Sequence, residues 1–441
     1  MSAYSIATRG LAGRKVPQGT LTAMGELLFS ASEPGAWYDP SDMSTLFQDS
    51  AGTTPVTAVE QPVGRILDKS GRGNHATQAT TTKRPVLSRR VNLFEETEGQ
   101  IVSNTNTYTC ERVAGNSPPG TEGYIKLTAT GVAAVPSKHF LAPSTSVAVS
   151  FYLKKGSSST QTVMLRNATT ATNFLPASII NMDTGAVTGP WSCSDAGNGW
   201  WKLSLVHTTG ISPGNTLSVY LGATAPSEAG AYWLLAGITA TPPIDAHLPY
   251  QRVNTATDYD ADPAKFPAYL RFDGVDDALQ TGNIDFTGTD KMTVWAGVRK
   301  NSDAATMMLA ELSTNSDSTN GTFALAASVF GNNYYTQSRG TVRSVQYATG
   351  YVAPNSAVLV AEAKISTDTL RLHVNNAAPL SSATDQGTGN YGNYPLYIGS
   401  RGGVAYPFNG RLYQLIIRGA QSSLSQIEAT EAYIKQKMRL P

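Results

Sequence analysis

The sequence is short of charge and of long apolar runs, and each shortage argues against a class of protein. Charged residues make up 15% of the 441 residues and the net charge is +1. No field of one sign therefore favours nucleic acid or an acidic membrane surface as the main partner. No apolar run approaches the roughly 18 residues of a membrane-spanning helix. We expect neither nucleic-acid binding nor membrane insertion.

Cysteine is also scarce. The chain has only Cys110 and Cys193, which do not show the spacing of a metal site. Residues 1–15 lack the hydrophobic core of a secretory signal peptide, so we expect folding in the cytoplasm of the cell that makes the protein. Because the cytosol is reducing, two free thiols are favoured, with a disulfide inside one domain as the alternative.

Turn-forming and aromatic residues are abundant instead. The chain contains 40 glycines, 24 prolines and 20 tyrosines. Glycine and proline supply turn geometry, while aromatic and β-branched residues fit a pleated surface. Length alone suggests about three domains. The composition predicts an all-β protein of many short strands.

Alternation of apolar and polar residues predicts half-buried strands in the middle of the chain. The pattern occurs over 147–153, 200–205 and 217–221, and 232–236 is more continuously apolar. Regular short strands separated by Gly/Asn-rich turns are typical of a sandwich. We therefore predict a separate β-sandwich over 92–255.

The end of the chain predicts more strands and one helix. Segments 269–279, 292–298 and 410–417 have strand patterns, the first with a tight turn at Asp273-Gly274. Ser423 and Gln426 form a capping-box pattern at the start of a helix. The apolar residues expected on one face of that helix are Leu424, Ile427, Ile434 and Met438.

Several of these segments together resemble one fold family. Residues 68–78 (Asp-Lys-Ser-Gly-Arg-Gly-Asn-His-Ala-Thr-Gln) and 270–277 resemble the opening strands of the concanavalin A-like, or laminin G-like, jelly roll. Residues 395–403 and 408–413 resemble its closing hairpin, and the terminal helix is similar to the usual ending of the family. In that family the two opening motifs lie close together, whereas about 190 residues separate them here.

The resemblance implies a jelly roll interrupted by an insertion. We expect residues 31–91 to form its first part and 256–441 the remainder, including the C-terminal helix. The insert, 92–255, resembles the carbohydrate-binding-module-like sandwiches of phage proteins. Residues 1–30 are expected to form a short N-terminal arm.

The arm is basic and has little apolar material. It carries Arg9, Arg14 and Lys15 against one acid, Glu26, and a short helix is expected over 21–29. Two interpretations stay open. The arm packs on its own domain, or it anchors the protein to a neighbouring virion protein.

A second resemblance bears on location. Trp37–Asp42, followed by Thr45–Gly52, is similar to segments of proteins encoded among phage structural genes. This resemblance implies a virion protein that is assembled in the host cytoplasm. Its partners would be other virion proteins, contacted through the arm, and further copies in a closed homo-oligomer.

Residues for catalysis are mostly absent. Hydrolases of the resembled fold place Glu-x-Asp-x-x-Glu, or a close variant, on one strand, which sets a nucleophile and a general acid on one face. No such run occurs, and Glu311 and Glu362 are isolated in strand-like segments. Five scattered histidines lack metal or triad spacing. We expect a protein that is not an enzyme and needs no cofactor.

One acidic turn is a candidate calcium site. Asp273, Asp276 and Asp277 cluster within five residues, and oxygen-rich turns can hold calcium. The favoured alternative is an ordinary turn whose aspartate caps its own backbone. Asp39 and Asp42 would complete a metal site only if the fold brings them near.

Aromatic side chains are the candidate sugar contacts, because sugar rings stack on exposed aromatic faces. Trp233 and Trp295 lie in apolar strands and are expected in the core. Residues 387–392 match G-x-G-x-x-G, but they lead into a strand and are expected to be a turn. The candidate stacking residues lie in Gly/Asn-rich segments or in the Trp200-Trp201 pair, and they are Tyr334, Tyr335, Tyr391, Tyr394, Tyr406, Trp191 and Trp200.

Three functions follow, in order of preference. The first is a tail-associated adhesin, a fibre or spike protein that contacts host surface glycans. The second is a capsid decoration or head-fibre protein. The third is a hydrolase of envelope polysaccharide. Fold alone does not choose between the first two, because function resides in sites and in assembly position.

Overall fold

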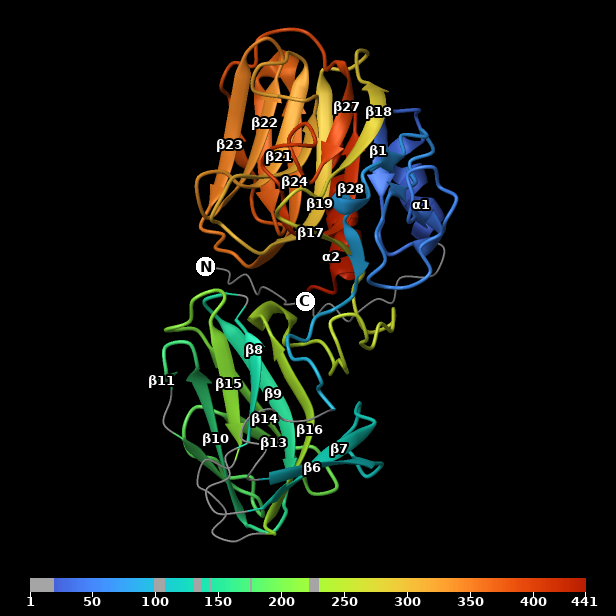
Figure 1. Cartoon of the computed structure of the whole chain (residues 1–441). Helices are drawn as coiled ribbons and strands as arrows, with labels where there is room; N and C mark the ends of the chain where they lie inside the picture. Colours follow the sequence, from blue (N-terminus) through green and yellow to red (C-terminus); the bar gives the residue numbers. More distant parts are fainter. Residues whose placement is uncertain (1–19, 99–107, 131–135, 143, 175–176, 222–229) are drawn as a thin grey trace, which may run out of the picture.

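The computed structural model describes residues 20–441, apart from 99–107, 131–135, 143, 175–176 and 222–229 (Figure 1). The candidate anchoring residues Arg9, Arg14 and Lys15 lie outside the described residues. Two α-helices are present in the described part, α1 (Thr20–Phe29) and α2 (Leu424–Met438). Neither is long and apolar enough to cross a membrane.

Four antiparallel sheets form two sandwiches, drawn one above the other in Figure 1. Two sheets build the first sandwich, which also carries the helices. The eight-stranded sheet runs β26 (Leu380–Ser382), β25 (Thr369–Val374), β24 (Asn355–Lys364), β19 (Lys291–Lys300), β28 (Asn409–Arg418), β17 (Tyr269–Asp273) and β5 (Val86–Ser88), with β1 (Gly35–Tyr38) paired to β28. The nine-stranded sheet runs β2 (Leu46–Phe47), β3 (Arg65–Ile66), β4 (Ala76–Thr77), β18 (Leu279–Asp285), β27 (Asn393–Ile398), β20 (Met307–Leu312), β21 (Thr322–Ser328), β22 (Asn333–Arg339) and β23 (Arg343–Thr349).

The other two sheets build the second sandwich from strands between Tyr108 and Thr241. The six-stranded sheet runs β13 (Ser192–Asp195), β14 (Trp200–His207), β9 (Val147–Lys154), β16 (Tyr232–Thr241), β7 (Gly123–Ala129) and β6 (Tyr108–Ala114). The five-stranded sheet runs β11 (Thr172–Asn173), β10 (Thr160–Asn167), β15 (Thr216–Leu221) and β8 (Ser137–Leu141), with β12 (Ser178–Asn181) paired to β10. Short 3₁₀ turns are η1 (Met43–Thr45), η2 (Thr81–Lys83), η3 (Pro243–Asp245) and η4 (Ile365–Thr367).

Early and late strands share the sheets of the first sandwich. β5 pairs with β17, β1 pairs with β28, and β4 pairs with β18. The expected fold class, an all-β chain with two sandwiches and a C-terminal helix, is confirmed. The exact residues at which one sandwich passes into the other stay a prediction.

One local expectation about strand pairing is wrong. β27 and β28 do not form a closing hairpin, because β27 pairs with β18 and β20 while β28 lies in the opposite sheet. The predicted tight turn at Asp273-Gly274 is present, and it carries the chain from β17 in one sheet to β18 in the other. Short connections between opposed sheets look like hairpin turns in a sequence, since both need the same turn residues.

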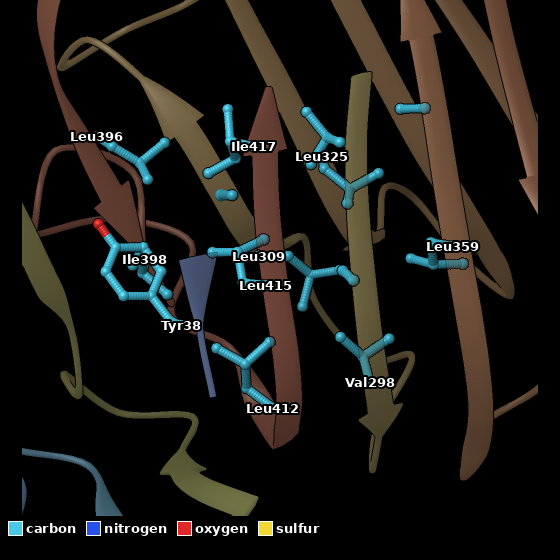
Figure 2. Close-up of a cluster of buried hydrophobic side chains, with 14 of the residues drawn as sticks. Tyr38, Val298, Leu309, Leu325, Leu359, Leu396, Ile398, Leu412, Leu415 and Ile417 are labelled. Atoms are coloured by element: carbon cyan, nitrogen blue, oxygen red, sulfur yellow. The ribbon is translucent and has the colours of Figure 1, made fainter. Parts of the chain in front are cut away.

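The core of the first sandwich lies between its two sheets (Figure 2). β28 and β19 contribute Leu412, Leu415, Ile417 and Val298 from one side, and Leu325 of β21 comes from the other. β19 is buried along both faces, from Met292 to Lys300. That pattern explains its continuous apolar run, because a strand covered on both sides does not alternate.

Helices α1 and α2 cover the outer face of the eight-stranded sheet. Leu28 and Phe29 of α1 pack with Trp295 of β19 and Ile434 of α2. A Cβ on Gly297 would lie 2.5 Å from Ile434 Cγ2, so glycine allows the helix to approach the strand closely. The described end of the expected arm therefore packs on its own sandwich.

The predicted capping box of α2 is present. The Ser423 hydroxyl accepts a hydrogen bond from the Gln426 backbone N–H, and the Gln426 side chain accepts one from the Ser423 N–H. Ile427, Ile434 and Met438 are buried as predicted. Leu424 is 67% exposed, so its assignment to the buried face is wrong. Leu424 is the first residue of the helix.

The segment 68–78 is a turn organised by one buried carboxylate. Asp68 accepts hydrogen bonds from the backbone N–H groups of Trp37 at 2.8 Å, Ser70 at 2.8 Å and Asn74 at 3.0 Å. The Asn74 side chain donates to the Gly35 carbonyl. These bonds tie the turn to β1, which gives the motif a structural role.

The two connections between the sandwiches are bonded to each other. The Gln251 side-chain oxygen accepts from the N–H groups of Val91 at 2.7 Å and Asn92 at 3.1 Å. The Asn92 amide donates to the carbonyls of Ile238 and Gln251, each at 3.0 Å. Both amide side chains are fully buried. The entry and exit segments therefore lie side by side.

The exit segment is also fixed to the first sandwich. Arg299 of β19 is buried and forms an ion pair with Asp245 of η3 at 2.6 Å. Breaking such a pair would leave one charge buried without its partner. The segment 242–249, which carries three prolines, is thus also held to the first sandwich by charge.

Cys110 and Cys193 are not joined in a disulfide, as the favoured interpretation expected. They lie on β6 and β13, the opposite edge strands of the six-stranded sheet. Trp233 and Trp295 are buried, as predicted. Residues 387–392 lead into β27 with no helix after them, as expected for a turn.

Candidate functional site

Most of the aromatic residues predicted to stack on sugars are in fact buried. These assignments are wrong, because a ring with almost no accessible surface offers no face to a ligand. The buried members, each at most 3% exposed, are Tyr334, Tyr335, Tyr391, Trp191 and Trp200.

The polar ends of these buried rings are satisfied inside the protein. The Tyr334 hydroxyl donates to Asn355 at 3.0 Å, and the Tyr391 hydroxyl bonds the Ser338 hydroxyl at 2.6 Å. Trp200 lies on the outer face of its sheet, where the Tyr124 ring covers it at 5.6 Å. Glycine and asparagine near these residues mark turns, but the tyrosines themselves stand in or beside strands.

Two of the predicted tyrosines keep accessible surface. Tyr394 on β27 is half-buried, and Tyr406 is 42% exposed in the loop between β27 and β28. The Arg401 guanidinium lies over the Tyr406 ring, 5.0 Å from its centre. Tyr406 is therefore the predicted aromatic best placed for stacking.

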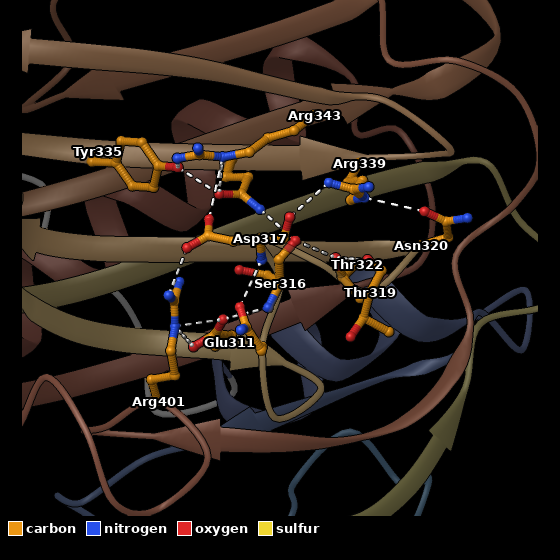
Figure 3. Close-up of polar contacts among 12 residues, drawn as sticks. Glu311, Ser316, Asp317, Thr319, Asn320, Thr322, Tyr335, Arg339, Arg343 and Arg401 are labelled. Atoms are coloured by element: carbon orange, nitrogen blue, oxygen red, sulfur yellow. Dashed lines mark hydrogen bonds and ion pairs between the residues drawn. The ribbon is translucent and has the colours of Figure 1, made fainter.

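Arg401 connects Tyr406 to a network of charged side chains on the outer side of the nine-stranded sheet (Figure 3). Arg401 binds the Glu311 carboxylate at 3.0 Å and the Asp317 carboxylate at 2.6 Å. The second oxygen of Asp317 pairs with Arg343 at 3.2 Å. Asp317 lies in the loop between β20 and β21, and its side chain stays 39% exposed.

The network continues from Arg343 to a second exposed ring. Arg343 donates to the Tyr335 hydroxyl at 2.9 Å and to Gln337 at 2.8 Å. The Tyr335 ring packs against Tyr347 of β23, with centroids 5.0 Å apart, and Tyr347 is 36% exposed. We call the surface from Tyr406 through Arg401, Asp317 and Arg343 to Tyr347 the tyrosine-flanked network.

The electrostatics keep this network charged and ordered. Burial acts to lower the pKa of Arg401, but the Glu311 charge and the bond to Asp317 outweigh it, so the pKa is raised. The pKa of Arg343 is raised by Tyr335 and Asp317 against the effect of burial. Burial also raises the pKa of Tyr335 to about 12. At neutral pH the surface thus presents fixed guanidinium donors and a carboxylate acceptor beside two rings.

Both isolated glutamates noted in the sequence are already engaged. Glu311 is fully buried, pairs with Arg401 and accepts a bond from the Ser316 N–H at 2.7 Å. Glu362 is buried on β24 and bonds His373 at 2.8 Å. A general acid must reach the glycosidic oxygen. Neither glutamate is placed to do so.

The three clustered aspartates do converge. One carboxylate oxygen from each of Asp273, Asp276 and Asp277 lies within 4.8 Å of the others. Burial and the charge of Asp273 raise the pKa of Asp277 to about 7. Asp273 also accepts a bond from the Val275 N–H at 2.7 Å, as in the favoured turn. The donor set suits calcium, but Asp39 and Asp42 do not complete it, since both pair with Lys69.

A cleft of about 750 Å³ lies where the two sandwiches meet. Its charged lining groups already have partners: Arg90 pairs with Glu95 at 3.2 Å, and Arg271 pairs with Glu60 at 3.0 Å. Burial lowers the pKa of Lys138 to about 8, and its ammonium donates to the Glu96 carbonyl at 2.6 Å. These contacts engage the charges of Arg90, Arg271 and Lys138 within the protein.

Sequence reasoning missed Asp317, Arg343, Arg401 and Tyr347. Arg401 lay inside a segment used only to identify the fold, and the others carried no motif. They come from the loop after β20, from β23 and from the loop after β27. Only the sheet order brings these segments together, so no local sequence signal identifies the set.

Comparison with known proteins returns structures only. No protein-family model and no curated protein matches the chain. Among similar solved structures is the CBM40 module of a Ruminococcus gnavus sialidase bound to α2,3-sialyllactose, with a TM-score of 0.28 and 15% identity, covering 34% of this chain and 97% of that one.

Two further structures are similar at the same level. Domains LG4–5 of mouse laminin α1 give a TM-score of 0.28 and 13% identity, covering 71% of this chain and 93% of that one. Domain 4 of a Geobacillus stearothermophilus arabinanase, in complex with arabinotriose, gives a TM-score of 0.30 and 11% identity, covering 42% of this chain and 89% of that one. At these scores, function has to be argued from the residues of this chain.

Proposed function

We propose that this protein is a non-catalytic glycan-binding protein and that the tyrosine-flanked network receives the saccharide. One observation carries the proposal: the exposed rings of Tyr406 and Tyr347 stand at the two ends of one continuous chain of ion pairs and hydrogen bonds. Rings of this kind stack on sugar faces, while Asp317 and Arg343 offer an acceptor and donors for hydroxyl groups.

The network is ordered before a ligand arrives. Both carboxylate oxygens of Asp317 are held by arginines, and the Arg339 guanidinium donates to the Asp317 carbonyl at 2.7 Å. A surface that is already ordered loses little conformational entropy on binding. A single site of two stacking contacts is nevertheless weak, on the order of millimolar, and would act through many copies.

The experiment is a glycan array probed with the full chain, followed by calorimetric titration of the best ligand. Tyr406→Ala and Tyr347→Ala should each weaken binding about two- to tenfold, because one stacking contact contributes about 0.5–1.5 kcal/mol beyond burial. Phe330→Ala is the matched control, since Phe330 is 95% exposed outside the network. Equal affinity in all three variants would overturn the assignment.

The finer part of the proposal is the setting: a tail-associated adhesin of a phage particle. Its support is the sequence resemblance of residues 37–52. Particles that lack the protein should adsorb poorly to host cells, and imaging should place few copies at the tail. Unchanged adsorption, with many copies over the head, would instead identify a capsid decoration protein. Release of reducing sugar by the purified chain would identify a hydrolase.

A further inference from the structure

The outer face of the six-stranded sheet in the second sandwich carries a repeated pairing of lysine with an aromatic ring. Each pair joins neighbouring strands, β14 with β9 twice and β16 with β7 once. In each, the ammonium nitrogen stands over the ring. The pairs are Lys126 over Tyr232 at 4.9 Å, Lys154 over Trp200 at 5.9 Å and Lys202 over Tyr152 at 5.9 Å.

The three lysines lie on different strands of the sheet: Lys202 on β14, Lys154 on β9 and Lys126 on β7, with β16 between the last two. Lys154 and Lys126 both stand opposite Leu234, which lies on the strand between them. Their backbones are therefore about two strand spacings, or ~10 Å, apart. Lys202 stands opposite Tyr152, two residues from Lys154 along β9, which makes the two lysines diagonal neighbours. The charges are thus spaced rather than clustered.

The aromatic rings are the partners of these charges, and no acidic side chain pairs with them in the described part of the chain. Among the residues that the structure describes, no carboxylate lies within ion-pair distance of Lys126, Lys154 or Lys202. The acid nearest in register is Glu111, opposite Lys126. Lys155, which directly follows β9, instead pairs with Asp183 at 2.7 Å.

A generally basic domain does not explain this face. Residues 92–255 contain eight lysines and arginines against nine acids. The positive charges of the face are therefore a local concentration in a domain of balanced charge. A local field of one sign attracts ligands of the opposite sign.

The aromatic partners hold the ammonium groups in place. A cation over a ring gains about 0.5–1 kcal/mol at an exposed site. The Trp200 ring is itself fixed, because its indole N–H donates to the Asn116 carbonyl at 2.9 Å. Tyr152 and Tyr232 are half-buried and keep part of their surface for a ligand. The face thus combines ordered cations with accessible rings.

We propose that this face binds a carboxylated polysaccharide. A polymer of acidic sugars presents spaced single charges and apolar ring faces, which match the spaced lysines and the two tyrosines. Duplex nucleic acid carries one charge per about 1.7 Å, a much denser array than three lysines on separate strands. The inference goes beyond the proposed function, because the face lies on the other sandwich and shares no residue with the tyrosine-flanked network.

The test is affinity electrophoresis of the full chain through gels containing polygalacturonate. The wild-type chain should be retarded, and the retardation should fall as salt rises from about 0.05 M to about 0.5 M, because exposed charges are screened. Combining Lys126→Gln, Lys154→Gln and Lys202→Gln should weaken binding about tenfold. Lys155→Gln should leave it unchanged.

The controls separate this proposal from its alternatives. Gels with neutral dextran should give no retardation. Absence of polygalacturonate binding, equal binding by the triple variant, or equal binding of duplex DNA or of phosphatidylglycerol vesicles would each overturn the proposal. Tyr406→Ala should not alter polygalacturonate binding, so failure of the first site and failure of this one are distinguishable.

Discussion

The two candidate binding surfaces, one on each sandwich, use charged residues in different ways. In the first, the charges of Glu311 and Arg401 are paired with each other beneath the surface, and Tyr335 is buried beside them. In the second, Lys154 and Lys202 contact rings and have no acid partner among the described residues. Both sandwiches place these residues on the outer face of a sheet.

The paired charges of the first surface stabilise the protein itself, whereas the unpaired charges of the second are available to a ligand. Paired, buried charges fix the loops that lie over the nine-stranded sheet, and removing one partner leaves the other desolvated. Unpaired charges at the surface contribute little to stability. Stability measurements on the two sandwiches should therefore diverge for the same residue types.

The largest divergence is expected for leucine. Leu28 of α1 is 1% exposed against α2 and β19, whereas Leu141 at the end of β8 is 64% exposed. Leu28→Ala should lower the free energy of unfolding by about 3–4 kcal/mol, because it leaves a cavity. Leu141→Ala should change it by less than about 0.5 kcal/mol. Urea denaturation followed by circular dichroism measures both; equal effects would contradict the packing of α1.

Loss of a buried carboxylate should come next. Glu311→Gln removes the partner of Arg401, and we expect a loss of about 3 kcal/mol, at the low end for a buried pair because Asp317 still binds Arg401. Lys154→Gln, the matched change in the second sandwich, should cost less than about 0.5 kcal/mol. The same denaturation curves provide the comparison. A harmless Glu311→Gln would show that the network does not hold the loops.

The aspartate turn should make stability depend on pH. The pKa of Asp277 is raised to about 7 from an ordinary value of 3.8, so the folded state favours its protonated form. The contribution that protonated Asp277 makes to folding stability is full below about pH 4, decreases as the pH rises to about 7, and is absent above that. Asp277→Asn should therefore raise the melting temperature at pH 8, by about 2–4 °C, and not at pH 4.

Adding calcium to the same melting experiment tests whether this turn binds the ion. If the three aspartates hold the ion, the less favoured interpretation of this turn, calcium at pH 8 should raise the melting temperature of the wild type through binding to the folded state. The Asp277→Asn variant should respond much less. Magnesium serves as the control, since it prefers a stricter octahedral geometry. A wild type indifferent to calcium would identify a turn without metal.

The smallest effect on stability is expected at the proposed sugar contact. Tyr406→Ala should change the free energy of unfolding by about 0.5 kcal/mol or less, because the ring is 42% exposed and only Arg401 lies over it. Tyr391→Ala should cost about 3–5 kcal/mol, since that ring is buried. Similar losses from both would mean that Tyr406 is a structural residue.

Strand positions were predictable wherever burial imposed a period. The alternation over 147–153 identified β9, and the continuous apolar run around Trp295 identified β19. The capping box at Ser423 identified the start of α2. Each depends on neighbours within a few residues, which a single sequence displays.

Exposure of individual aromatics was not predictable in the same way. Trp200 stands on the outer face of its sheet, yet Tyr124 and the turn at Asn116 cover it. Tyr335 alternates as a surface residue would, but Arg343 and Tyr347 close over it. Cover of this kind comes from segments distant along the chain, so it depends on sheet order and not on local pattern.

The bonded entry and exit of the second sandwich have a consequence for protein engineering. Because Gln251 binds Val91 and Asn92 directly, the whole second sandwich departs from and returns to nearly one point of the first. The paired strands β5 and β17 both lie outside the segment 91–251 along the chain. A foreign domain with adjacent termini could therefore be exchanged for this one between Asn92 and Thr241, which keeps Asp245 as the partner of Arg299 and leaves the strand order of the host as it is.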